Sequence, residues 1–121
     1  MLKVISESGF LISDKIINCN TFLKRFMGLM MRKSLNGFDG ALITPCNSIH
    51  SFFMRMSIDC YFLDKDNRIV KIIKDFKPWR LCWIVREAQS VLELPAGYLK
   101  ENTLSVGDRL SIYDQNKVSS S

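Results

Sequence analysis

The segment from Cys46 to Asp64, CNSIHSFFMRMSIDCYFLD, concentrates the residue types that can do chemistry. It contains the only histidine of the chain, His50, and two of the four cysteines. Cys46, His50 and Met54 are spaced by four residues, and a thiolate, an imidazole and a thioether together suit Cu(I). This spacing raises the possibility of a soft-metal site.

Extended geometry argues against such a copper site. Four residues of a strand span roughly 13 Å, whereas a soft ligand lies about 2.3 Å from its metal ion. The three ligands would meet only if the chain bent sharply near residues 47–48 or formed a helical turn. Because methionine and cysteine more often fill gaps in a core, we expect no cofactor and keep a copper carrier as an alternative.

An enzyme would have to depend on His50, since no other imidazole is available. Cys46 is the candidate nucleophile, and Asp59 or Glu93 could orient the ring, as in a catalytic triad. Cys46 follows Pro45 in a loop context, however, without the strained turn that usually presents a nucleophile. We expect His50 to be a hydrogen-bonded residue at a strand start, and a small hydrolase or transferase stays an alternative.

The charged residues around this segment predict either an ion pair or a binding site. Glu93 lies in the apolar context VLELPAG, where a buried carboxylate is costly unless a cation pairs with it. Arg55 and Asp59 would lie roughly 13 Å apart on one strand face, too far to neutralise each other directly. Arg55 is therefore the natural partner of Glu93. Arg25, projecting from a predicted helix, could be a second cation.

An unpaired guanidinium in a pocket would instead accept a carboxylate or phosphate ligand. The candidate ligand-binding cluster therefore comprises Arg25, His50, Arg55, Asp59 and Glu93.

Hydrophobic periodicity predicts the elements that position these residues. Every even position from Phe52 to Phe62 is apolar and the odd positions are mixed, which indicates a strand with one buried face. Residues 64–67, DKDN, predict a turn, and RIVKIIK predicts the returning strand of a hairpin. Further strands are predicted on both sides of Ser8-Gly9, at GALITP, at VLEL and after Gly107-Asp108.

One helix is predicted, in NTFLKRFMGLMMRKSLNG. Its apolar residues repeat at helical spacing, Asn20 or Thr21 can cap its start, and Asn36-Gly37 supplies a stop. The segment with Trp79 and Trp83 is expected to be a loop at the rim of the fold. PAGY at residues 95–98 predicts a tight turn whose backbone N–H groups could face an anion.

Composition bounds the class of protein. With 121 residues, 47% hydrophobic and 24% charged, the chain is expected to form one domain, residues 1–115, with a frayed tail over 116–121. The net charge of +5 gives weak attraction to phosphate or an anionic surface, but the basic residues are scattered, so nucleic acid is an unlikely partner. The absence of a Cys-x-x-Cys motif and of a long apolar run predicts a cytoplasmic protein with reduced thiols and no membrane span.

Several stretches occur in an order that resembles one family: FMGLMMRKSL, SFFMRMSIDCYFLDKDNRIVKI, VLELPAGY and VGD. The chain resembles the domain-of-unknown-function family 192, also called uncharacterised protein family 0127, over about residues 20–113. The resemblance implies a compact, mostly β single domain of bacteria or archaea, some members being exported, with no assigned activity. The family's aromatic-Met-basic-Asn pattern reads Phe53-Met54-Arg55-Met56 here, so its amide is missing.

Together these observations predict a mainly β fold, a small barrel-like or sandwich domain of about seven short strands with one amphipathic helix. The predicted function is a non-enzymatic ligand-binding or protein-interaction module, of bacterial source, whose partner is a small anionic ligand or a protein.

Overall fold

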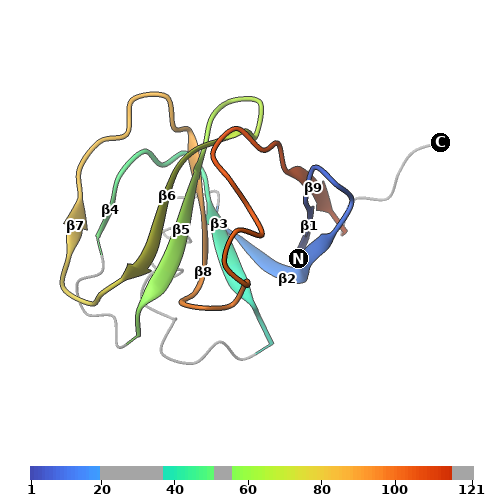
Figure 1. Cartoon of the computed structure of the whole chain (residues 1–121), viewed down its shortest axis with the longest axis horizontal. Coiled ribbons are helices and arrows are strands. Elements are labelled where there is room, and N and C mark those ends of the chain that lie inside the picture. Colours follow the sequence, from blue (N-terminus) through green and yellow to red (C-terminus); the bar gives the residue numbers. More distant parts are fainter. Residues whose placement is uncertain (20–36, 51–55, 116–121) are drawn as a thin grey trace.

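Nine β-strands form in the part of the chain that the computed structural model describes, residues 1–19, 37–50 and 56–115, and this part contains no helix (Figure 1). The strands are β1 (Leu2–Ile5), β2 (Leu11–Cys19), β3 (Gly40–Ile43), β4 (Ile49–His50), β5 (Ile58–Leu63), β6 (Ile69–Phe76), β7 (Leu81–Cys82), β8 (Ser90–Pro95) and β9 (Ser111–Asp114). The predicted helix falls on residues outside the described part and stays a prediction, as does the tail over residues 116–121.

Seven strands build one sheet in the order β6-β5-β8-β3-β2-β1-β9, and β4 pairs with β7 in a separate small sheet. All neighbours in the large sheet are antiparallel except β2 and β3, which are parallel. The sheet is not closed along its edges, since β6 and β9 are not paired and the segments next to them meet in an isolated bridge between Arg68 and Arg109. The predicted mainly β fold is confirmed, in an open rather than a closed form.

The turns that sequence predicted lie where the chain reverses. Gly9, between β1 and β2, has a φ of 90°, and Asn67, between β5 and β6, has a φ of 63°. The carboxylate of Asp64 accepts the backbone N–H of Asp66 at 2.9 Å and that of Arg68 at 3.0 Å, which holds the second turn together. Both hairpins are therefore confirmed.

Strand β5 is shorter and more buried than its sequence indicated. The prediction was a strand over residues 52–62 with one buried face, but β5 begins at Ile58, and residues 51–55 lie outside the described part. All six residues of β5 are buried, including Asp59 at 1% exposure. The reason is its position: β5 lies between β6 and β8, and apolar residues cover both faces of the sheet there.

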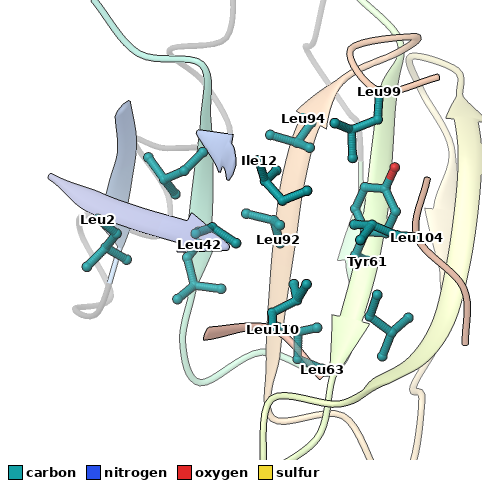
Figure 2. Packing of buried hydrophobic residues seen from close by; sticks show 13 residues of the cluster. Leu2, Ile12, Leu42, Tyr61, Leu63, Leu92, Leu94, Leu99, Leu104 and Leu110 are labelled. Atoms are coloured by element: carbon teal, nitrogen blue, oxygen red, sulfur yellow. The ribbon is translucent and has the colours of Figure 1, made fainter. Parts of the chain in front are cut away.

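One face of the sheet carries the larger apolar cluster, shown in Figure 2. Its buried members are Leu2, Val4, Ile12, Ile16, Leu42, Tyr61, Leu63, Ile69, Leu92, Leu94, Leu99, Leu104 and Leu110. Leu99 and Leu104 come from the connection between β8 and β9, which crosses this face and covers it (Figure 2). The opposite face of β5 packs in a second cluster with Ile58, Cys60 and Phe62.

Strand β3 approaches β8 so closely that its first residue must be glycine. A Cβ built on Gly40 would overlap the backbone oxygen of Glu93 and would lie 2.7 Å from Cδ2 of Leu94. Neither atom can move freely, because Glu93 and Leu94 are fully buried in β8. The missing side chain of Gly40 therefore sets the spacing of the two central strands.

The segment between β6 and β8 was predicted to be a loop, and it contains one short strand. Leu81 and Cys82 form β7, in which Cys82 pairs with Ile49 and Leu81 with His50 of β4. Two residues are too few to show an alternating pattern, so sequence periodicity does not reveal such a strand.

Candidate functional site

Asp59 is the centre of a polar cluster on the face of β5 that also carries Tyr61. Its Oδ1 accepts the backbone N–H of Asp75 at 2.7 Å, and its Oδ2 accepts that of Gly97 at 3.0 Å. The ammonium Nζ of Lys74 lies 3.1 Å from Oδ2. A carboxylate that is 1% exposed is thus compensated by two N–H groups and a cation, as burial of a charge requires.

The turn at residues 95–98 forms as predicted. The N–H of Tyr98 donates to the carbonyl of Pro95 at 3.0 Å, and Gly97 has a φ of 80°, a conformation that favours glycine. The N–H of Gly97 does face an anion, and that anion is the carboxylate of Asp59. The turn therefore fixes the polar cluster from the end of β8.

Lys74, on β6, connects this cluster to the surface. Its Nζ donates to the hydroxyl of Tyr61 at 3.1 Å and lies 5.6 Å from the centre of the Tyr61 ring, within range of a cation–π contact. Burial lowers the pKa of Lys74, but the hydrogen bonds with Tyr61 and Asp59 outweigh it and the pKa is raised. The side chain, 42% exposed, is therefore a charged ammonium at neutral pH.

Tyr61 remains a protonated phenol beside that ammonium. Burial raises its pKa above the usual 10.0, and the hydrogen bond from Lys74 opposes this only in part. Because Lys74 donates to the phenol oxygen, the phenol proton is directed away from that ammonium.

A pocket of about 510 Å³ opens beside these two donors. It is lined by Tyr61, Ile72, Lys74, Lys100, Glu101, Asn102, Thr103 and Leu104. One wall is the β5–β6 hairpin and the other is the connection after β8, where Leu104 lies beside the Tyr61 ring (Figure 2). The second wall is ordered by a turn in which Thr103 donates both its N–H, at 3.2 Å, and its hydroxyl, at 2.6 Å, to the carbonyl of Lys100.

Glu93 lies on the other side of the sheet from Asp59. In the pairing of β5 with β8, Asp59 is opposite Leu94, and Glu93 is opposite Cys60. Paired residues share a face and successive residues alternate, so the two carboxylates project in opposite directions. Glu93 is fully buried, next to Cys60 and Ala41 on its flanking strands.

The remaining predicted members of the cluster are placed only in part. Arg25 and Arg55 lie outside the described residues, so the pair between Arg55 and Glu93 stays a prediction. The backbone of His50 pairs with Leu81 of β7. The Cys46 thiol donates to the carbonyl of Ser48 at 2.9 Å.

The two alternatives to a binding module are likewise untested. Met54, the third predicted copper ligand, lies outside the described residues. Within residues 1–19, 37–50 and 56–115, no group of three or more His, Cys, Asp or Glu side chains is arranged to hold a metal.

Lys74, Tyr61 and Lys100 were not among the predicted site residues. The DKDN turn could have pointed to Lys74 from the sequence alone. A hairpin through residues 64–67 brings the end of the RIVKIIK strand back to Asp59. The pairing of β5 with β6 shifts between Ile58 and Cys60, so counting from the turn alone gives the wrong partner for Asp59.

Sequence comparison shows the family of the chain. The model of the DUF192 family, described as "Uncharacterized ACR", matches residues 7–112. The chain belongs to the DUF192 family. The family resemblance seen in the sequence motifs is thereby confirmed.

Curated relatives of this DUF192 chain are UPF0127 proteins of archaea. One from Thermococcus kodakarensis is 39% identical over 116 residues, covering 89% of this chain and 71% of the relative. One from Pyrococcus furiosus is 39% identical over 94 residues, covering 75% and 80%. These relatives give no support to the predicted bacterial source.

Two crystal structures share the fold of this DUF192 domain. A candidate transcription regulator from Sinorhizobium meliloti 1021 has a TM-score of 0.72 and 26% identity, covering 91% of this chain and 90% of its own. A protein of unknown function from Novosphingobium aromaticivorans has a TM-score of 0.73 and 20% identity, covering 91% and 82%. In the described residues, no helix has the length and apolar character needed to cross a membrane.

Proposed function

We propose that this protein is a non-enzymatic binding module that takes a small organic anion into the pocket beside Tyr61 and Lys74. One observation carries the proposal. The Lys74 ammonium and the Tyr61 phenol, 3.1 Å apart, present two donors on one wall of a pocket of about 510 Å³. Pockets of roughly 300–1,000 Å³ with a few fixed polar groups are typical of small-molecule sites.

The donor arithmetic favours a carboxylate-like group. An ammonium has three N–H donors, and among the described residues two of them are directed to Asp59 and Tyr61. The third N–H of Lys74 and the O–H of Tyr61 can then meet two oxygens of one ligand. Hydrogen bonds to an ionised acceptor are the stronger kind, so the pair selects an anion over a neutral amide.

The charge of the pocket limits the ligand to a weak anion. Lys100 adds a second cation to the lining, but Glu101 offsets it, and Asp59 balances Lys74. A polyphosphate would therefore meet too little positive charge here, whereas a monocarboxylate can bind through the hydrogen bonds of Lys74 and Tyr61. Ile72 and Leu104 supply apolar wall for the carbon part of such a ligand.

The lining supports binding rather than catalysis. Among the described residues that line the pocket, none is a histidine or a cysteine, and the two donors are both protonated. Neither is suited to act as a general base at neutral pH. Asp59 serves the site by holding Lys74, and Arg25, His50, Arg55 and Glu93 stay predicted members of the wider polar cluster.

Thermal-shift screening of small carboxylates and inorganic phosphate, followed by calorimetry of any hit, tests the proposal. Lys100→Gln changes an exposed side chain, and Tyr61→Phe removes only a hydroxyl, so both should fold. Loss of one hydrogen bond to a charged group costs about 1.5 kcal/mol, or roughly tenfold in Kd.

Lys71→Gln is the matched control. Lys71 is an exposed residue of the same strand β6, but it pairs with Phe62 and so points away from the Tyr61 face. It carries the same change in net charge as Lys100→Gln. Equal Kd values for the pocket variants and this control would refute the pocket as the binding site.

A further inference from the structure

A short segment on the far side from β9 exposes four large apolar side chains. The exposed fraction is 56% for Trp79, 53% for Leu81, 72% for Trp83 and 56% for Ile84. These residues lie on and around β7, at the opposite end of the view from β9 in Figure 1. Contiguous exposed apolar residues mark an interaction surface more often than scattered ones do. We call residues 79–86 the tryptophan segment.

The tryptophan segment is held so that these side chains face outward. Cys82 is buried and packs in the second core cluster with Ala88, while its neighbours Leu81 and Trp83 are exposed. The N–H of Val85 donates to the carbonyl of Asn47 at 2.7 Å, which fixes the chain just after Ile84. The apolar surface is thus preformed on an anchored backbone.

Two arginines accompany the apolar residues. Arg80 and Arg86 are exposed, and Glu87 is the only acidic residue between positions 77 and 87. Lys77 pairs with Asp75 at 2.6 Å, and the exposed Arg86 adds positive charge to this surface. A guanidinium forms paired hydrogen bonds with phosphate oxygens particularly well.

We propose that the tryptophan segment docks this protein on the surface of an anionic lipid bilayer. Tryptophan prefers the boundary between headgroups and acyl chains, where its ring is buried and its N–H stays wet. Leu81 and Ile84 contribute the purely apolar contacts, and Arg80 and Arg86 contact lipid phosphates. Single-stranded nucleic acid fits less well, because bases stack on aromatic rings but gain little from Leu81 and Ile84.

The chain offers an internal reporter for this docking. Its two tryptophans are both in the tryptophan segment, so its tryptophan fluorescence reports on that surface alone. With vesicles of three parts phosphatidylcholine to one part phosphatidylglycerol, we expect a blue shift of emission and quenching by brominated acyl chains. The protein should co-sediment with these vesicles, less so at high salt, and hardly with phosphatidylcholine alone.

Three variants distinguish a loss of lipid docking from a loss of folding. Trp83→Ser and Arg86→Gln change exposed residues and should weaken co-sedimentation, the arginine change by about fivefold. Tyr113→Ser, on β9 with 54% exposure, removes a comparable aromatic at a distant place and should leave it unchanged. A near-constant thermal midpoint for all three confirms folding.

Several outcomes would overturn the proposal. The first two are a lack of co-sedimentation with anionic vesicles and equal binding to neutral vesicles. The other two are unchanged vesicle binding by Trp83→Ser and Arg86→Gln, and a blue shift of emission caused by self-association without lipid. Tight binding of a single-stranded oligonucleotide with no binding to vesicles would assign the surface to nucleic acid instead. Because Lys100→Gln leaves the tryptophan segment intact, failure of pocket binding and failure of lipid docking are independent results.

Discussion

The ammonium of Lys74 lies 3.1 Å from the carboxylate of Asp59, and the two side chains differ sharply in exposure, 42% against 1%. One partner is therefore part of the core and the other part of the surface. Backbone N–H groups from two other places in the chain, Asp75 and Gly97, converge on the buried partner. This ion pair joins the interior of the sheet to the wall of the pocket.

Removal of the buried partner should destabilise the fold. Asp59→Ala leaves two backbone N–H groups without their acceptor and Lys74 without its counter-ion, so we expect a loss of about 3 kcal/mol in the free energy of unfolding. Urea unfolding at pH 7 measures it. Asp66→Ala, in the exposed turn after β5, is the control and should change stability by less than about 0.5 kcal/mol. Equal effects of the two substitutions would contradict the central place given to Asp59.

Alkaline pH should weaken the same cluster. The folded state raises the pKa of Lys74 above 10.5 and that of Tyr61 above 10.0, so it binds both protons more tightly than the unfolded chain does. This stabilisation is complete below the unfolded values and is lost as pH rises through the folded ones. The urea midpoint should therefore fall from about pH 10 upward, and Lys74→Gln should make that fall shallower than Lys71→Gln does. Parallel pH profiles for the two variants would refute the prediction.

Gly40 provides a test of the spacing between β3 and β8. Gly40→Ala forces a Cβ into the backbone of Glu93, so we expect a loss of about 3 kcal/mol from overpacking. Gly9→Ala is a useful comparison, because Gly9 has a φ of 90° but open space around its Cα. That change should cost about 1 kcal/mol from backbone strain alone. Thermal and urea unfolding measure both losses. A larger loss for Gly9→Ala than for Gly40→Ala would show that the contact with β8 is unimportant.

The predicted pair between Arg55 and Glu93 can be tested by a double-mutant cycle. If the two side chains neutralise each other, Arg55→Met and Glu93→Gln should each destabilise, and the double variant should lose clearly less than their sum. A coupling of at least about 1 kcal/mol is expected for a buried pair in contact. Additive effects, measured by urea unfolding, would show that Glu93 is balanced by another group.

Local sequence patterns predicted the strands and turns well, because these depend on neighbouring residues. Gly9, Asn67 and Gly97 adopt the positive φ values that their turns require, and the alternating segment became a strand from Ile58 onward. The burial of both faces of β5 could not be predicted in this way. It depends on β6 and β8 flanking β5, and Asp59 reads as a solvent-facing residue unless its three partners are known.

The candidate site was predicted less completely for the same reason. Asp59 was identified from its residue type, but Lys74 and Tyr61 gain their roles from cross-strand register, and Lys100 from a connection that folds back over the sheet. Glu93 is a further residue whose position depends on register. It lies one strand away from Asp59 yet on the other face, since the register offsets the two by one residue.

The position of β8 has a consequence for synthesis of the protein on the ribosome. Strands β1, β2 and β3 form one group and β5 and β6 another, and within the described sheet β8 alone hydrogen-bonds to both groups. Until residues 90–95 leave the exit tunnel, β3 and β5 each present an open edge that can pair with another nascent chain. The central hydrogen bonds therefore form after most of the polypeptide has emerged, and substitutions that delay β8 should increase aggregation during translation more than they alter the finished protein.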